Sequence, residues 1–285
     1  MKNDIFNPER FGKLLVADLR NYISEHSVNL IVFSLIGVAI FLIVGAFSII
    51  FGTEWYSLGL GGRTTIMLIT GFLFAITNPA KVYGKITDKR AGTMFLQLPA
   101  SSLEKTLSMV VVSCIVAPFL FFAIWLVADM LICLAAPGAG DAIMLSSTQI
   151  KDFCIRALTE TNSDANAMNI QLLSSWWIFV DDAIQQILYF LLGATIFKTA
   201  KTAKTFGCLM ALGSVIGTVI MAVMVFKYAD NFMEFVDTYG SKGINSIYGN
   251  GWIANHAILY DTISDTVVNL GLIALIWLRV KKIKH

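Results

Sequence analysis

Four aspartates placed in apolar surroundings are the residues of this chain whose type and position first suggest chemistry: Asp129, Asp181, Asp182 and Asp265. An ionised carboxylate at the middle of a bilayer costs at least a few kcal/mol, so such a side chain is expected to face water, a ligand or a polar partner. One interpretation is a polar outer vestibule close to an exit pathway. The other is interfacial acids that are hydrated or bonded to neighbouring amides. Those amides are Gln185, Gln186 and Asn269.

Catalysis and metal binding find little support in the sequence. The Asp181–Asp182 pair has no His, Glu–Glu or Ser–Lys companion, so an intramembrane enzyme is the weakest interpretation. The three His residues are scattered, and no two of the four Cys residues have CxxC spacing. We therefore expect no catalytic residue, metal site, cofactor or disulfide framework in this chain.

The second feature that suggests a function is the segment Lys81–Lys105, which carries five of the basic residues between two apolar runs. Another polar stretch, Gly52–Gly62, is rich in glycine but lacks the GxxxxGK[ST] pattern of a phosphate-binding loop. Nucleotide chemistry is therefore not expected within this chain, which is not predicted to be an enzyme.

The composition indicates what these segments are attached to. The chain has 285 residues, of which 56% are hydrophobic and 14% charged, whereas soluble proteins are about a quarter charged. This leaves too little polar surface for a water-soluble protein of this size, so the bilayer is the expected surrounding. A net charge of +2 gives no reason to expect a nucleic-acid partner.

The apolar runs predict an all-α fold, a single polytopic helical bundle over residues 1–285. Span one has 24 residues, enough to cross a hydrocarbon core of about 30 Å. An amphipathic helix at 6–26 precedes it, and prolines are expected to end or bend span two at Asn78–Pro79 and to kink span three at Pro118. The six predicted spans are 28–51, 64–79, 107–135, 172–197, 206–226 and 263–279.

The basic residues predict the orientation of this bundle. Sixteen of the 21 Lys and Arg residues fall in the N-terminal lead, the 81–105 segment, the turn between spans four and five, and the C-terminal tail. Basic loops stay in the cytoplasm, so both termini and the 81–105 segment are expected there, with the two long loops outside. The four aspartates would then share a similar outer depth.

Within this segment, the run Asp88–Ser101 (DKRAGTMFLQLPAS) resembles the acid-basic-x-G-T-x-x-x-L-x-L-P-x-S run of type-2 ABC exporter permeases. In that family this loop is a coupling helix that docks on a separate ATPase subunit. The six spans and the N-terminal amphipathic helix also resemble the family. The resemblance implies an ATPase partner, a second permease chain (identical or related) and the inner membrane of a bacterium. This chain departs from the family in two respects. Family members often have Glu at the positions of Asp88 or Lys89, and the loop between spans three and four is long in this chain.

The chemistry of the segment fits that role. A short helix of this composition presents charges and an apolar side chain to a groove on a soluble partner, and Leu98–Pro99 ends it. Ser101 or Ser102 is then expected to cap the next helix. The alternative is a loop whose charges only set the topology. The predicted coupling residues are Asp88, Lys89, Arg90, Gly92, Thr93, Met94 and Phe95.

These features together predict the permease subunit of an ABC exporter with an unidentified substrate. A membrane scaffold or sensor that does not transport, and whose outer loops bind a ligand, is the alternative, and the intramembrane enzyme is the weaker one.

Overall fold

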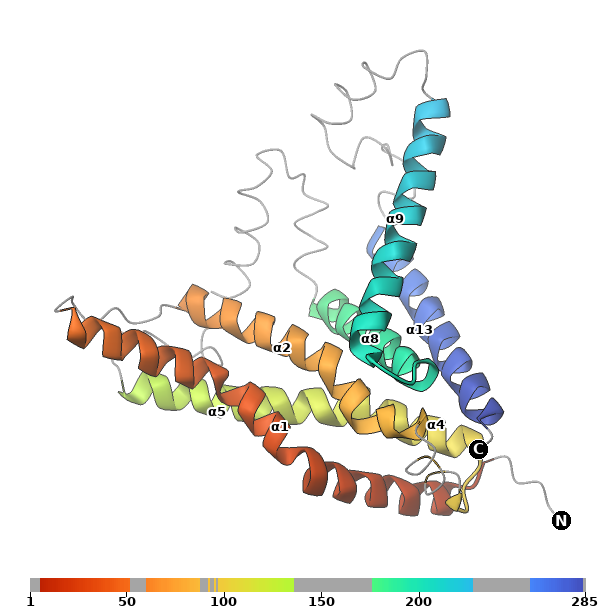
Figure 1. Cartoon of the computed structure of the whole chain (residues 1–285), viewed down its shortest axis with the longest axis horizontal. Helices are drawn as coiled ribbons and strands as arrows, with labels where there is room; N and C mark the ends of the chain where they lie inside the picture. Colours follow the sequence, from red (N-terminus) through yellow and green to blue (C-terminus); the bar gives the residue numbers. More distant parts are fainter. Residues whose placement is uncertain are drawn as a thin grey trace.

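The computed structural model describes residues 6–51, 60–87, 92, 95, 97–135, 176–227 and 257–283, and the regular structure in these ranges is helical throughout. The prediction of an all-α fold is confirmed for them. The long helices, shown in Figure 1, are α1 (Pro8–Ile50), α2 (Leu60–Tyr83), α5 (Ala117–Ala135), α8 (Trp176–Ile196), α9 (Lys201–Lys227) and α13 (Ala257–Lys282). Shorter elements are η1 (Gly84–Thr87), α4 (Ser102–Val111) and η2 (Val112–Val116).

Five helical stretches of the described ranges are long and apolar enough to cross a membrane. Large apolar side chains such as Val28, Leu42 and Leu134 are more than half exposed on them, as expected where lipid rather than water surrounds a helix. The helix expected as span four, α8, is not among the five. The five stretches are Pro8–Phe47, Gly62–Thr87, Ser102–Leu134, Lys201–Val219 and Ile263–Lys282.

The first two predicted segments, 6–26 and 28–51, form one continuous helix, α1. Its charged part precedes Val28 and its apolar part follows, so only the second part suits a bilayer core. Figure 1 shows that α1 changes direction along its length. The change in polarity near Val28 therefore marks where the surroundings of α1 change from polar to apolar, and it does not mark a helix end.

Prolines interrupt the helices less than the sequence suggests. α2 runs through Pro79 and ends at Tyr83, about one turn beyond the predicted end. Before Pro118, η2 is a π-helical stretch in which the Ala117 N–H donates to the Val112 carbonyl. A proline ring clashes with the carbonyl four residues earlier, and a wider π turn gives that carbonyl room. The helical path therefore continues from α4 into α5.

The helices form two groups. α1 and α2 both contact α5, α8 contacts α9 and α13, and the α2–α8 contact joins the groups. Phe74 of α2 stacks on Phe121 of α5 with ring centroids 4.9 Å apart, and Leu188 and Ile276 are fully buried. A Cβ added at either glycine of the Gly213-xxx-Gly217 stripe of α9 would meet no atom within 4 Å. The stripe therefore makes no close helix contact with the described part of the chain.

One end of the bundle gathers the segments that the sequence predicts on a single side. We call it the basic end, defined by the start of α1, η1, the start of α4, the α8–α9 turn and the end of α13. Arg10 bonds Glu104, Thr87 donates to the Phe197 carbonyl, and Arg279 Nε donates to the Thr195 carbonyl at 3.2 Å. Figure 1 places the end of α13 and α4 together at this end.

Candidate functional site

The predicted coupling residues lie between η1 and α4, at the basic end. Gly92 is buried, and Phe95 is half-buried and packs against the main hydrophobic core. The Lys105 ammonium lies 5.3 Å from the Phe95 ring centroid, which joins this segment to α4. The other five predicted residues, Asp88, Lys89, Arg90, Thr93 and Met94, lie outside the described ranges.

The segment is fixed on its N-terminal side through η1. The Thr87 hydroxyl donates to the carbonyls of Gly84 at 3.0 Å and Phe197 at 3.3 Å, and the Lys201 ammonium also donates to the Gly84 carbonyl. Ala200 adopts a positive φ of 48° in the α8–α9 turn, a backbone conformation that is unusual for residues other than glycine. A tight turn between α8 and α9 therefore holds η1.

On the C-terminal side, Glu104 fixes the start of α4. The side chain of Ser101 caps α4, and the Glu104 carboxylate accepts from the Ser101 N–H at 2.9 Å, which completes a capping box. The same carboxylate accepts from Arg10 Nε and Nη2 at 2.8 and 2.7 Å and from the Asn7 N–H at 2.8 Å. Four N–H donors therefore converge on one fully buried carboxylate.

The electrostatics of this contact follow from its donors. Glu104 precedes the apolar stretch 107–135, and its hydrogen bonds with Arg10 lower the pKa of its carboxyl from 4.5 to about 2, while burial acts in the opposite direction. The carboxylate is thus ionised at neutral pH. Bidentate arginine–carboxylate pairs are charge-assisted and geometrically specific. Glu104 therefore fixes the position of the first turn of α1 relative to α4.

Two further contacts attach α1 to both flanks of the segment. The Ser108 hydroxyl of α4 donates to the Asp18 carboxylate. The Lys85 ammonium of η1 lies 2.6 Å from the Glu25 carboxylate. Successive parts of the charged half of α1 therefore contact elements that precede and follow the predicted coupling residues.

The four aspartates occur in two different helix contacts. Asp129 of α5 forms an ion pair with Arg63 of α2, with Nε and Oδ1 3.0 Å apart and both side chains almost fully buried. Asp181 of α8 accepts from the Asn269 amide of α13 at 2.7 Å, which is one of the bonds that the sequence interpretation weighed. Asp182 is exposed and Asp265 half-buried. A polar vestibule shared by all four remains a prediction.

Two residues of these contacts were missed by sequence reasoning. Arg63 directly precedes the predicted span 64–79, so the sequence indicates only a basic residue of a loop. Its position near the start of α2, beside α5, is what shows its partner. Glu104 had a detectable signal, because Ser101-x-x-Glu104 is the pattern of a capping box. The pattern predicts the bond with Ser101, but the bond with Arg10, 94 residues away, depends on tertiary structure.

The described ranges contain no group of three His, Cys, Asp or Glu residues able to hold a metal ion. Comparison of the chain with protein-family models, curated proteins and solved structures found no match. The functional argument therefore depends on the residues of this chain alone.

Proposed function

We propose that this chain is the transmembrane permease subunit of an ABC exporter in the cytoplasmic membrane of a bacterium. The basic end faces the cytoplasm, α8 crosses the membrane as the predicted span four in addition to the five apolar stretches, and the charged part of α1 is the N-terminal connecting helix. A separate ATPase subunit supplies the energy, and a second permease chain completes the pathway for an unidentified substrate.

The observation that supports this proposal best is the fixation of the predicted coupling segment on both sides. On one side, Thr87 of η1 bonds the α8–α9 turn. On the other side, Glu104 of α4 bonds the first turn of α1. A force applied to residues 88–95 would therefore reach α1, α4 and α8 together, because networks of hydrogen bonds and ion pairs couple the elements that they join.

The proposed mechanism uses that arrangement. ATP binding draws two ATPase subunits together, and each pulls on the coupling segment of its permease chain. η1 and α4 move with the segment and carry α2 and α5. The pathway between the two permease chains then changes from inward to outward access.

The partner can be tested by purifying the tagged full chain from its native membranes. We expect a protein with ATPase activity to co-purify, and the double variant R90A/M94A to reduce its recovery and its stimulated activity about tenfold. Lys13→Ala is the matched control, because Lys13 is an exposed cation of the same end whose ion-pair partner, among the described residues, is Glu9. Unchanged recovery and activity in R90A/M94A would contradict the proposal, and absence of any ATPase would favour a scaffold or sensor.

The orientation is tested separately by labelling a single engineered thiol, Thr93→Cys, in intact cells, in a chain whose four native Cys residues are replaced by Ser. A membrane-impermeant maleimide should react only after the cells are opened, since the basic end is proposed to face the cytoplasm. Labelling of intact cells would place the segment where no ATPase subunit is available.

A further inference from the structure

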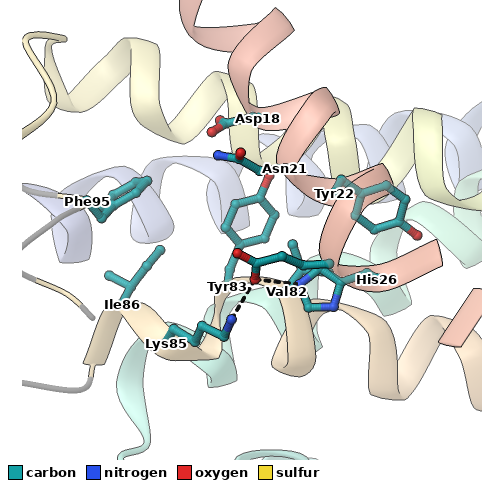
Figure 2. A pocket seen from close by; sticks show the side chains of 10 residues that line it. Asp18, Asn21, Tyr22, His26, Val82, Tyr83, Lys85, Ile86 and Phe95 are labelled. Carbon is teal, nitrogen blue, oxygen red and sulfur yellow. Dashed lines mark hydrogen bonds and ion pairs between the residues drawn. The ribbon is translucent and has the colours of Figure 1, made fainter. Parts of the chain in front are cut away.

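A cavity of about 150 Å³ opens at the basic end between α1, the end of α2, η1 and Phe95. Figure 2 shows Asp18 and Asn21 next to each other on α1, with Phe95 and Ile86 beyond them and His26 on the opposite side. The cavity combines charged groups with an apolar wall. Its lining also includes Tyr22, Glu25, Val82, Tyr83 and Lys85.

The charges of the described residues that line the cavity sum to a negative value. Asp18 and Glu25 contribute two carboxylates and Lys85 one ammonium, which already lies 2.6 Å from Glu25. Burial, followed by the nearby Lys85, lowers the pKa of His26, so this imidazole is neutral at pH 7. Among the described lining residues, one negative charge therefore remains without compensation.

That charge belongs to Asp18. Its carboxylate accepts a hydrogen bond from the neutral Ser108 hydroxyl. Within the described ranges, no Lys, Arg or His nitrogen lies close enough to this carboxylate, 4.0 Å or less, to form an ion pair with it. A half-buried carboxylate with one neutral donor loses hydration that a single hydroxyl replaces only in part. A bound cation with N–H donors would replace the rest with charge-assisted bonds.

The other lining residues indicate which chemical group the cation is attached to. Asn21 is exposed beside Asp18 and offers an amide oxygen as a second acceptor. Ile86, Val82 and Phe95 form an apolar wall, which suits a short alkyl stem. Lys105 does not line the cavity, and its ammonium is already placed over the Phe95 ring.

We propose that this cavity binds one organic cation, an alkylguanidinium or alkylammonium group, with its N–H donors on Asp18 and Asn21 and its stem against Ile86 and Phe95. The inference is independent of the export proposal, because it uses only the cavity and its lining.

The test is calorimetric titration of the full chain in a neutral detergent at pH 7.5 with N-butylguanidinium, n-butylammonium and N-butylurea. Butylurea has the shape of butylguanidinium without its charge. We expect the two cations to bind with a Kd of about 1 mM or below, and butylurea to bind at least about tenfold more weakly.

Three variants locate the binding. Asp18→Asn keeps an acceptor for Ser108 and should weaken cation binding about tenfold or more. Glu25→Gln, at a side chain that is 56% exposed and therefore safe for folding, should weaken it about threefold or more, because Lys85 then acts without its counter-charge. Glu9→Gln removes the same charge from α1 outside the cavity and should leave the Kd unchanged.

Two sources of the cation are distinguished by the affinity. A micromolar Kd for butylguanidinium would identify a free small cation, whereas a Kd near about 1 mM would identify a side chain that a larger molecule presents at high effective concentration. Absence of saturable binding below about 10 mM, equal binding of butylurea, or unchanged binding in both D18N and E25Q would each overturn the proposal.

Discussion

Two arginine–carboxylate pairs lie at different places in this bundle, and their surroundings differ although their chemistry is the same. At the basic end, Arg10 is 38% exposed and Glu104 has four N–H donors. Between α2 and α5, the side chains of Arg63 and Asp129 are 3% and 0% exposed, with a 3.0 Å contact. The first pair keeps one ion in contact with water, and the second removes both ions from it.

The difference shows how burial changes what an ion pair does. Desolvation of two charges can cancel their attraction, so a fully buried pair contributes little net stability, yet loss of one partner is expensive. A carboxylate with several donors and a partly hydrated arginine avoids much of that cost. We therefore expect Arg63–Asp129 to specify which helices meet, and Arg10–Glu104 to stabilise the contact that it makes.

The largest effect is expected from breaking the buried pair. Arg63→Met or Asp129→Leu should each destabilise the protein by about 3–5 kcal/mol, because each leaves the opposite charge buried without that partner. The double variant R63M/D129L should recover most of the loss, since apolar residues of similar volume often replace a buried pair without cost. The measurement is the unfolding midpoint in a mild detergent.

The double variant is the decisive member of this set. If R63M/D129L is as unstable as the worse single variant, the pair contributes net stability and the contrast between the two pairs disappears.

A smaller effect is expected at the other pair. Glu104→Gln should cost about 1.5–3 kcal/mol at pH 7, the range for hydrogen bonds to a charged group. The pKa of Glu104 is about 2, below its ordinary 4.5, so its contribution is complete above pH 4.5 and is lost as pH falls toward 2. Unfolding midpoints of wild type and E104Q should therefore converge across this range.

Convergence is the specific sign of a titrating carboxylate. A difference between wild type and E104Q that stays constant from pH 7 to pH 3 would mean that the side chain acts through shape or capping and that its charge is irrelevant.

How much of this was predictable follows from how local each feature is. The apolar runs and the Ser101-x-x-Glu104 pattern involve residues within one helix or turn, so composition and spacing predict them. The bond from Arg10 to Glu104 and the pair between Arg63 and Asp129 each join residues more than 60 positions apart. Nothing in the spacing of such residues specifies which charged residues become neighbours.

The helix boundaries show the same limit. Polarity changes near Val28, but backbone hydrogen bonds continue through that point and α1 does not end there. Pro79 and Pro118 each remove one N–H, but the chain continues as helix through the first and widens into η2 before the second. Sequence reasoning located the perturbations and overestimated their effect, because neighbouring helices support a helix that loses one bond.

The contrast between close and open surroundings extends to packing. A Cβ added at Gly193 of α8 would lie 1.8 Å from the Thr205 Oγ1 of α9, whereas one added at Gly213 meets nothing within 4 Å. Gly193→Ala should therefore destabilise by about 1–3 kcal/mol through overpacking. Gly213→Ala is the control and should be neutral or slightly stabilising, because alanine favours a helix. The measurement is the thermal unfolding midpoint of each variant. Equal midpoints for Gly193→Ala and Gly213→Ala would show that α8 and α9 do not approach closely at Gly193.

The smallest effect is expected from a third ion pair, which isolates the influence of exposure. Glu9 and Lys13 are 78% and 77% exposed and 2.7 Å apart, one turn from each other on the same helix as Arg10. Exposed pairs of this kind contribute about 0.3–0.5 kcal/mol, because water screens them and both side chains lose freedom. Glu9→Gln should therefore shift the unfolding midpoint far less than E104Q, and moderate salt should remove the shift. A loss in E9Q as large as in E104Q would mean that the first turn of α1 responds to any change of charge, and that the four donors of Glu104 have no special effect.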